Sequence, residues 1–332
     1  MMNFCTLFDS NYISKGIALY LSIERYTTDF TLYVMAMDRK CQSMLKTIGF
    51  EHVVVDCIED VDDHALSMAK GNRSRAEFCW TCGSYVTDWV LHHYELPDIT
   101  YLDSDLMFFN SPQIVFEEFE RKDSSVGLTP HFMRYPLFGK YCVQYVYFKN
   151  DADGAACLRW WRDECLKWCY SRVEDGKYGD QKYLDYFAEC FNHVCETENR
   201  CVGIAYWNMN ENSYEGSRTF YEGKEWPTVF FHYSGINVQV KDGVMTFRHT
   251  MYMTDVILKT FIEPYAKLMK EVFCKYLETP IHEVKIIPMN KWNYRAKAVT
   301  YYLSKILPID RIVYNVMKVK YRESHKPYSE KY

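Results

Sequence analysis

The stretch Ile99-Thr100-Tyr101-Leu102-Asp103-Ser104-Asp105 decides the fold of this chain. Its first four residues form a short apolar run that is typical of a buried strand, and two carboxylates follow at once. Hard oxygen ligands of this kind suit Mg²⁺ or Mn²⁺, and such ions commonly share their coordination shell with phosphate oxygens. An Asp-x-Asp pair also occurs in ordinary solvated loops, so the preceding strand is what favours a metal site.

Strands and helices alternate around this stretch over the first half of the chain. Hydrophobic periodicity and turn residues predict strands at 3–8, 30–37, 52–57 and 99–102, and helices at 14–26, 40–48 and 74–94. Residues 58–73 are acidic and then polar, which predicts a loop over a site. The alternation predicts an α/β fold with a mostly parallel sheet covered by helices on both faces. Ligands of such sheets bind beyond the carboxyl ends of the strands, where Asp103, Asp105, Asp9 and Asp38 lie.

The second half of the chain is less regular. The same signals predict strands at 125–128, 145–148 and 228–233, and helices at 153–170, 179–187 and 254–277. The Asp242-Gly243 pair between two short apolar runs predicts a hairpin. We therefore expect one α/β unit over residues 1–250, divided into two halves at about residue 110, and a helical, basic extension over 251–332.

Charge is distributed unevenly along the chain. The net charge of −5 argues against a general nucleic-acid binder. From Lys285 to Tyr332 there are 11 Lys and Arg against 3 Asp and Glu, a net charge of +8, so the other 284 residues sum to −13. Such a basic tail suits docking to an anionic membrane surface, with Tyr301 and Leu303 among the apolar residues of an interfacial helix. Packing of the tail onto the body of the protein is the alternative.

The cysteines indicate a reducing compartment. There are 13, an odd number without a compact framework, and the chain shows neither a leader nor an apolar run near the ~18 residues that span a bilayer. We expect a cytoplasmic protein, at the inner face of the membrane if its tail docks there. Cys79 and Cys82 have redox or zinc spacing, but the helical pattern around them favours buried thiols.

Several further residues are candidates for the chemistry. His232 ends the apolar strand just before a Gly-containing turn, where it would complete a metal shell, and imidazole beside two carboxylates favours Mn²⁺. A lone histidine there is otherwise structural. Asp180 and Gln181 precede an amphipathic helix, where Asp180 is either a cap or faces the transferred group. The candidate cations for a diphosphate are Lys15, Arg75, Arg134 and Lys140.

Three common enzyme motifs are absent from the sequence. There is no Gly-x-x-x-x-Gly-Lys-Ser/Thr loop, no Gly-x-Gly-x-x-Gly after the first strand, and no Gly-x-Ser-x-Gly elbow. These absences exclude a P-loop NTPase and remove the usual dinucleotide and hydrolase fingerprints.

The chain resembles GT-A-fold nucleotide-sugar glycosyltransferases, in particular bacterial sugar transferases related to glycosyltransferase family 8. The resemblance covers residues 3 to about 240 and rests on five segments in family order: 4–10 (FCTLFDS), 101–105 (YLDSD), 179–185 (GDQKYLD), 205–208 (AYWN) and 231–235 (FHYSG). It implies a Rossmann-like sheet, Mn²⁺ or Mg²⁺ as cofactor, and a nucleotide-sugar donor, with uridine as the commonest base. It also implies that residues 1–250 are the catalytic domain, with a nucleotide-binding half over about 1–110 and an acceptor half over about 111–250.

The resemblance also implies roles for individual residues. Thr6, Phe8, Asp9 and Ser10 would line the nucleotide pocket, with Asp38 near the base or ribose and Arg75 and Ser104 beside the nucleotide. Asp103, Asp105 and His232 would hold the metal, and Asp103 would also reach the ribose side. Asp180 and Gln181 would face the donor sugar and the reacting carbon, and Trp207 and Asn208 would flank the acceptor cleft.

Two departures from the family pattern bear on the donor site. Relatives often carry Asn-x-Gly where this chain has Cys142-Val143-Gln144, so its contacts to the donor sugar differ. Family 8 members also place a lysine shortly after the metal-binding histidine, whereas Gly235 is followed here by Ile236-Asn237-Val238. Another cation must therefore stabilise the diphosphate.

The sequence thus predicts a glycosyltransferase that moves a sugar from a nucleotide diphosphate to a hydroxyl of a glycan or lipid-linked acceptor, as in polysaccharide biosynthesis. Family resemblance favours retention of anomeric configuration; an inverting enzyme would use Asp180 as its base. A nucleotidyltransferase is a weaker alternative, because Gly16 is the only glycine before Gly49 and a triphosphate loop needs more. A degenerate family member that binds glycans or a partner without turnover is the non-enzymatic alternative.

Overall fold

The computed structural model describes residues 1–61, 63–133, 138–215, 218–249 and 252–288. Its first half alternates strands and helices as predicted. The elements are β1 (Met2–Phe8), α1 (Ile13–Glu24), β2 (Phe30–Ala36), α2 (Arg39–Ile48), β3 (Val53–Cys57), α3 (His64–Asn72), α4 (Arg75–His93) and β4 (Asp98–Leu102).

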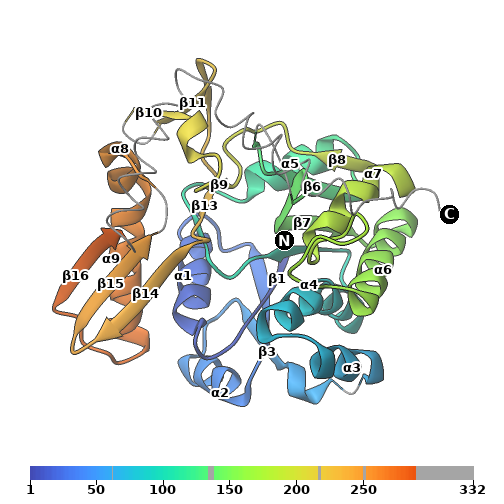
Figure 1. The fold of residues 1–332 in the computed structure, drawn as a ribbon, viewed down its shortest axis with the longest axis horizontal. Helices are drawn as coiled ribbons and strands as arrows, with labels where there is room; N and C mark the ends of the chain where they lie inside the picture. Colours follow the sequence, from blue (N-terminus) through green and yellow to red (C-terminus); the bar gives the residue numbers. More distant parts are fainter. Residues whose placement is uncertain (62, 134–137, 216–217, 250–251, 289–332) are drawn as a thin grey trace.

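A seven-stranded sheet forms the centre of the fold (Figure 1). Its order is β3-β2-β1-β4-β7-β6-β8, where β6 is Val126–Pro130, β7 is Tyr141–Lys149 and β8 is Val194–Glu196. Strands β1 to β4 run parallel, β7 runs antiparallel to both of its neighbours, and β8 is parallel to β6. The predicted α/β fold with a mostly parallel sheet is confirmed, with β7 as the reversed strand.

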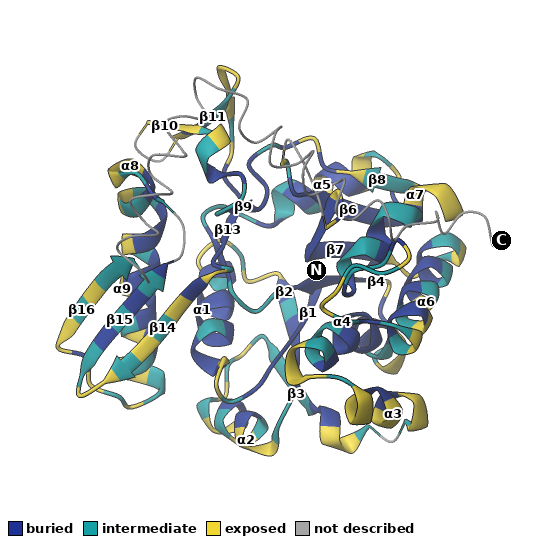
Figure 2. Ribbon diagram, in the orientation of Figure 1, coloured by how far each residue is buried: buried dark blue, intermediate teal, exposed yellow. Residues whose placement is uncertain are grey.

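Both faces of the sheet are covered, which explains why its strands read as continuous apolar runs. All seven residues of β1 are buried (Figure 2). Phe4 and Phe8 belong to the apolar core that includes α1, whereas Cys5 and Leu7 belong to the core that includes α4. Alternate side chains of one strand thus enter two separate cores.

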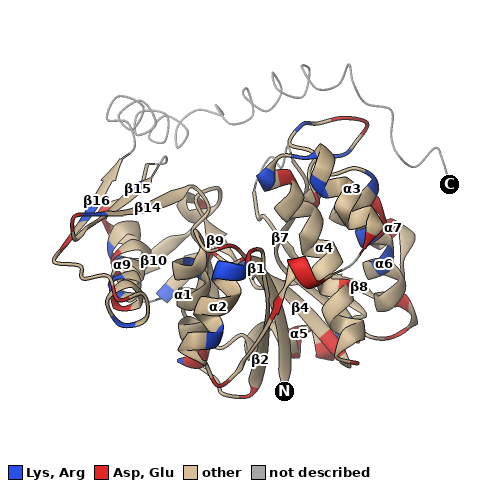
Figure 3. Cartoon of the chain, turned by 90° about the horizontal axis from the view of Figure 1, so that it is seen from below, with Lys and Arg blue, Asp and Glu red and all other residues tan. Residues whose placement is uncertain are grey.

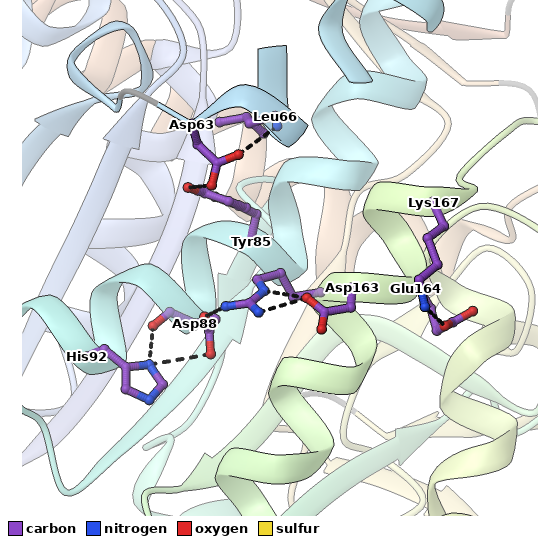
Figure 4. Close-up of polar contacts among 9 residues, drawn as sticks. Asp63, Leu66, Tyr85, Asp88, His92, Asp163, Glu164 and Lys167 are labelled. Atoms are coloured by element: carbon purple, nitrogen blue, oxygen red, sulfur yellow. Dashed lines mark hydrogen bonds and ion pairs between the residues drawn. The ribbon is translucent and has the colours of Figure 1, made fainter. Parts of the chain in front are cut away.

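The prediction of a loop over residues 58–73 is wrong, because α3 occupies most of it. Asp63 caps this helix by accepting a hydrogen bond from the Leu66 backbone N–H at 2.9 Å, and it also accepts one from the Tyr85 hydroxyl at 3.0 Å (Figure 4). Leu66 and Ala69 are buried on the inner side of the helix. Packing against α4, rather than a strong apolar period in the sequence, therefore stabilises α3.

A buried ion pair joins α4 to α6 (Ala152–Lys167). The Asp88 carboxylate, which is 5% exposed, accepts a hydrogen bond of 2.5 Å from the Arg162 guanidinium. Arg162 also contacts Asp163 at 2.7 Å, and the His92 ring lies 3.4 Å from Asp88 (Figure 4). This network fixes how the two helices pack on the sheet.

Three smaller sheets extend the fold beyond the central one. Strands β5 (Leu106–Phe108), β13 (Phe230–His232) and β9 (Ile204–Ala205) form the sheet that carries the candidate site. Strands β10 (Ser213–Glu215), β11 (Arg218–Tyr221) and β12 (Lys224–Trp226) form a second, and β14 (Ile236–Lys241), β15 (Val244–His249) and β16 (Glu283–Pro288) form a third.

The predicted Asp242-Gly243 hairpin turn is confirmed between β14 and β15. Both turn residues have positive φ, +50° for Asp242 and +71° for Gly243, as a tight turn of this kind requires. Strand β16 pairs in parallel with β15 and was not predicted. From the sequence, this stretch is predicted to belong to a helical extension. It forms a strand because it pairs with β15, and the local sequence does not show that pairing.

The predicted helix over 254–277 is confirmed as a run of helical segments: α8 (Asp255–Ile257), a π-helical turn (Leu258–Ile262), α9 (Glu263–Glu271) and a second π-helical turn (Val272–Tyr276).

The Tyr265 ring stacks on that of Tyr233, with 3.6 Å between ring centroids. Tyr276 contacts Phe50 across 5.2 Å. Residues 255–276 thus pack on the body of the protein.

The predicted domain boundary at residue 250 stays a prediction, and β15 and β16 pair across it. The basic tail from 289 onwards, including the predicted interfacial helix, lies outside the described residues. Within the described residues, no helix is long and apolar enough to cross a bilayer. Basic and acidic residues are interspersed on α9, which carries Glu263, Lys267, Lys270 and Glu271 (Figure 3).

The helix predicted at 179–187 is present, but it is mostly a 3₁₀ helix rather than an α-helix. Residues Gln181–Tyr186 form a 3₁₀ helix, η2, and the α-helical turn α7 (Phe187–Cys190) follows. Tyr183, Leu184 and Phe187 are all buried at this point. The apolar spacing in the sequence correctly predicted which side chains are buried. The segment is nevertheless a 3₁₀ helix, which winds more tightly than an α-helix.

Candidate functional site

Two backbone hydrogen bonds hold the Asp103-Ser104-Asp105 turn against neighbouring strands. The Asp103 N–H donates to the Gln144 carbonyl of β7 at 3.1 Å, and the Asp105 carbonyl accepts from the Tyr233 N–H at 2.9 Å. The turn lies between the end of β4 and the start of β5. Both carboxylates are therefore fixed at the carboxyl end of the central sheet, where the sequence predicts them.

His232 reaches these carboxylates through the sheet formed by β5, β9 and β13. It ends β13, opposite Leu106 of β5. Its Nε2 lies 3.0 Å from Asp105 Oδ1 and 3.6 Å from Asp103 Oδ2. Each of the three residues offers one ligand atom, and these atoms all lie within 4.8 Å of one another. The fold thus brings His232 to the two aspartates of the predicted metal-ligand set, which lie 127 and 129 positions before it in the sequence.

Gln144 orients the His232 ring from behind. Its Oε1 lies 2.9 Å from His232 Nδ1, and both side chains are buried. Because an amide oxygen only accepts, this contact assigns a hydrogen to Nδ1 and turns Nε2 towards Asp103 and Asp105. A histidine held this way is suited to ligate a divalent cation, so the donor set fits Mn²⁺ or Mg²⁺.

The two carboxylates have different electrostatic surroundings. Burial raises the pKa of Asp103 to about 6, with Asp105 adding to this effect and His232 opposing it. Burial also opposes ionisation of Asp105, but His232 and Lys15 outweigh it and hold its pKa below the usual range. Burial lowers the pKa of His232, yet Asp105 and Asp103 raise it well above its ordinary value. The site concentrates negative charge that a cation would balance.

A pocket of about 870 Å³ opens in front of these residues. This volume suits a small-molecule ligand of nucleotide size. Ten of the predicted site residues line the pocket: Phe8, Asp9, Arg75, Asp103, Ser104, Asp105, Asp180, Gln181, Trp207 and His232. The structure therefore gathers the acidic turn, the histidine and the Asp180-Gln181 segment around one space.

Four predicted site residues do not line the pocket: Thr6, Ser10, Asp38 and Asn208. Thr6 is fully buried in β1. Asp38 accepts hydrogen bonds from the backbone N–H groups of Ser10 at 3.0 Å and of Cys41 at 2.7 Å, so it caps α2 and fixes the turn after β1. The buried Asn208 side chain donates to the His131 carbonyl at 2.9 Å. Their predicted roles toward ligands stay predictions.

The four candidate cations lie in different places. Lys15 contacts Asp105 at 3.2 Å, and Arg75 lines the pocket and pairs with Asp9. Lys140 pairs with Glu196 at 2.5 Å and does not line the pocket. Arg134 lies outside the described residues.

Asp180 faces the pocket rather than capping the helix that follows it. Its side chain makes no capping hydrogen bond with η2, while its backbone carbonyl accepts from the Trp161 indole N–H at 2.9 Å. Burial, together with the negative charge of Asp103, raises the pKa of Asp180 well above its ordinary value. Gly179 precedes it with φ of +53°, a conformation that glycine adopts without strain.

Sequence reasoning missed the aromatic wall and a thiol–imidazole pair. Trp80, Tyr178 and Phe138 line the pocket, with 4.5 Å between the Phe138 and Tyr178 ring centroids. Cys142 lines it beside His131; burial raises the pKa of the thiol, but His131 and His232 outweigh this and lower it to about 7. The high aromatic content was the available signal, yet these residues belong to separate segments that only the fold brings together.

The chain has the GT-A fold of nucleotide-sugar glycosyltransferases. The galactosyltransferase LgtC, crystallised with donor and acceptor sugar analogues, superposes with a TM-score of 0.51 and 12% identity, covering 81% of this chain and 95% of LgtC. An active-site mutant of LgtC gives the same TM-score at 13% identity, over 80% of this chain and 95% of LgtC. At such identities the likeness defines the fold, and it confirms the resemblance seen in the sequence.

The chain belongs to the same family as YfnF of Bacillus subtilis (strain 168). That uncharacterised protein is 30% identical over 251 residues, which are 71% of this chain and 82% of YfnF. A second uncharacterised protein of the same strain, YfnD, is 28% identical over 249 residues, 71% of this chain and 78% of YfnD. No protein-family model matches the chain.

Proposed function

We propose that this protein is a metal-dependent glycosyltransferase. It moves a sugar from a nucleotide diphosphate sugar, with a UDP-sugar as the expected donor, to a hydroxyl of a glycan or lipid-linked acceptor. The observation that carries this proposal is the meeting of Asp103, Asp105 and His232 at the wall of one large pocket. The GT-A fold supports the same class of donor.

The three ligands suit a hard divalent cation that shares its shell with phosphate oxygens. A bound Mn²⁺ or Mg²⁺ supplies charge neutralisation, which makes a nucleoside diphosphate a better leaving group. The chain's own contribution is to orient the ligands: β7 fixes Asp103 and Gln144, and β13 fixes His232. The nucleotide would lie along Phe8, Asp9 and the segment that follows β1.

Asp180 and Gln181 are the proposed residues at the reacting carbon. Both line the pocket on which the metal ligands open. In a retaining reaction, which the family resemblance favours, they would orient the donor sugar while the departing phosphate accepts the acceptor's proton. In an inverting reaction Asp180 would accept that proton, and its raised pKa suits a general base. The aromatic wall of Trp80, Tyr178 and Phe138 would pack against the sugars.

The proposal is tested by metal-dependent binding and turnover in the full chain. The melting temperature is measured with a panel of sugar nucleotides, with and without Mn²⁺, for wild type, Asp105→Asn and the surface control Asp123→Asn. Asp123 is 81% exposed in its side chain and already has positive φ, which Asn tolerates. Nucleoside diphosphate release is then followed for the donor that binds.

We expect one sugar nucleotide to raise the melting temperature only with metal, in wild type and Asp123→Asn but not in Asp105→Asn, and to be turned over. Binding without release of nucleoside diphosphate, with every acceptor offered, would favour a glycan- or partner-binding protein instead. The absence of a shift with every nucleotide would contradict the proposed donor site.

The basic tail bears on the acceptor. The segment from Lys285 to Tyr332, which includes this tail, has a net charge of +8, and such a charge suits an anionic membrane surface, which would bring the enzyme to a lipid-linked acceptor. Co-sedimentation with phosphatidylglycerol vesicles, comparing the full chain with a truncation after Pro288, tests this role. The cut keeps β16 in its sheet. We expect the full chain alone to pellet at low salt; equal pelleting of both proteins would rule out a membrane role for the tail.

A further inference from the structure

The charge balance of the site calls for a cation besides the metal. Two carboxylates, Asp103 and Asp105, already balance a divalent ion, so the negative charge that develops on a departing diphosphate needs another positive group nearby. Among the residues that the structure describes, Arg75 lines the pocket and Lys15 contacts a metal ligand directly. These two side chains differ in the residues that they contact and in how far they are buried.

Lys15 lies on the far side of the Asp105 carboxylate from His232. Its Nζ is 3.2 Å from Asp105 Oδ2, whereas His232 Nε2 is 3.0 Å from Oδ1. The Lys15 side chain is only 13% exposed, and its ammonium also lies 4.4 Å from the centre of the Tyr12 ring, which lines the pocket. Lys15 does not itself line the pocket, but its ammonium lies between Asp105 and Tyr12, which both do.

The backbone of α1 fixes where Lys15 can reach. The Lys15 N–H donates to the Tyr12 carbonyl at 2.9 Å in the first turn of the helix. The next residue, Gly16, packs so closely on Phe8 that an added Cβ would lie 2.2 Å from its ring. The helix therefore presses directly on the end of β1, and the four-carbon stem of Lys15 turns its charge to the metal ligands.

Arg75 contacts a different acid from Lys15 and is much more exposed. Its guanidinium pairs with Asp9, and its side chain is 67% exposed. Asp9 also accepts hydrogen bonds from the backbone N–H groups of Asn11 at 2.8 Å and Tyr12 at 3.1 Å. Arg75 thus braces the turn after β1 from the solvent side, where its charge is screened.

We propose that Lys15 is the protein cation that binds the diphosphate of the donor and stabilises it as it leaves. This inference rests on the proposed function and names a residue that acts on the leaving group. Its ammonium would donate to an oxygen of the bound diphosphate, and the contact of 3.2 Å with Asp105 would keep it oriented. The alternative is that Lys15 serves only as the counter-ion that holds Asp105 in place.

Binding measurements on the full chain separate these roles. Isothermal titration with Mn²⁺ present compares a nucleoside diphosphate with the corresponding monophosphate, using the base that binds wild type best. The variants are Lys15→Met, Lys15→Arg and the control Lys149→Met. Lys149 lies opposite Asp98 in the register of β7 and β4, at the other end of β4 from Asp103. Titration with Mn²⁺ alone is a further readout.

Lys15→Met should weaken diphosphate binding about ten-fold or more, because it removes a charge-assisted hydrogen bond. The monophosphate should lose much less, Lys15→Arg should restore part of the loss, and Lys149→Met should bind as wild type does. Binding of Mn²⁺ alone should not weaken, because a neighbouring ammonium repels a cation.

Three outcomes would overturn the inference: unchanged diphosphate affinity in Lys15→Met, equal losses for the two nucleotides, or a loss of Mn²⁺ binding that explains the nucleotide effect. The last would establish the counter-ion role. If wild type itself binds no nucleoside diphosphate with Mn²⁺, the proposed function fails and this inference fails with it. If wild type binds the nucleoside diphosphate with Mn²⁺ and only the Lys15 variants depart from these expectations, this inference fails but the proposed function stands.

Discussion

The Gln144 side-chain oxygen lies 2.9 Å from Nδ1 of His232, and this contact determines which nitrogen of the ring faces the two carboxylates. Gln144 is fully buried in β7, between residues that are themselves buried. A polar side chain in the middle of a central strand is costly unless it is hydrogen-bonded. Its contact to His232 accounts for its presence there and ties the metal-ligand geometry to the central sheet.

Replacing Gln144 by Met should weaken metal binding while leaving the fold intact. Met has a similar volume but cannot accept the Nδ1 hydrogen, so His232 loses its orientation. Loss of such an outer partner typically costs about 10- to 100-fold in metal affinity. Titration of Mn²⁺, with the far-ultraviolet circular dichroism spectrum as the folding control, measures this effect. An unchanged affinity would show that the β13 backbone alone orients His232.

Gly203→Ala should damage the same contact from the other side. Gly203 has φ of +72°, and an added Cβ would lie 2.0 Å from Gln144 Nε2. Gly223→Ala is the matched control, because that glycine has φ of +78° but nothing within 4 Å of the added atom. Both variants should lose about 1–2 kcal/mol of unfolding free energy from backbone strain. Only Gly203→Ala should also lose Mn²⁺ affinity, and equal affinities would contradict this account.

The sequence predicted the parts of the site that follow from strand ends. Asp103 and Asp105 come directly after an apolar run, and His232 ends another, so their placement at one sheet edge could be argued from periodicity. The same reasoning could not find Gln144 as the partner of His232. That contact joins residues 88 positions apart, on the strands β7 and β13, and no local pattern shows that these two strands meet.

The fold shows the same division between local and tertiary signals. The Asp242-Gly243 turn and the helix α4 were both predicted from local signals. The structure adds that the Ser74 side chain caps α4 by accepting a hydrogen bond from the Glu77 N–H. By contrast, α3 has a weak apolar pattern, and β16 reads as part of a helical extension. Each is stabilised by a partner element, α4 for the helix and β15 for the strand. Short segments whose stability comes from such pairing are the ones that sequence reasoning missed.

Removing the buried charge at Asp88 should destabilise the packing of α4 on α6. Asp88→Asn removes the buried carboxylate that contacts Arg162, while the exposed Asp163 still pairs with that guanidinium, and we expect a loss of about 1–3 kcal/mol in unfolding free energy. Asp60→Asn removes an acid from the solvent-exposed pair with Arg39 and should change stability little. Urea unfolding measures both. Similar losses of unfolding free energy in the two variants would show that the burial of Asp88 does not increase the contribution of its ion pair to stability.

Glu118 should make stability fall at acidic pH. Its carboxylate is 6% exposed and accepts hydrogen bonds from the Thr197 hydroxyl at 2.7 Å, the Glu198 N–H at 2.6 Å and Lys122 at 2.9 Å. Burial opposes ionisation, but these donors outweigh it and lower the pKa of Glu118 below its ordinary value.

Because the folded-state pKa of Glu118 is depressed, its contribution to stability is complete above the unfolded value, about 4.3, and is lost as pH falls through the folded value. Glu118→Gln should therefore cost about 1–3 kcal/mol at pH 7, and the gap between variant and wild type should narrow below about pH 4.3. Urea unfolding at pH 7, 5 and 3.5 checks this. A gap that stays constant across this range would mean that the cost comes from geometry rather than from the charge of the Glu118 carboxylate.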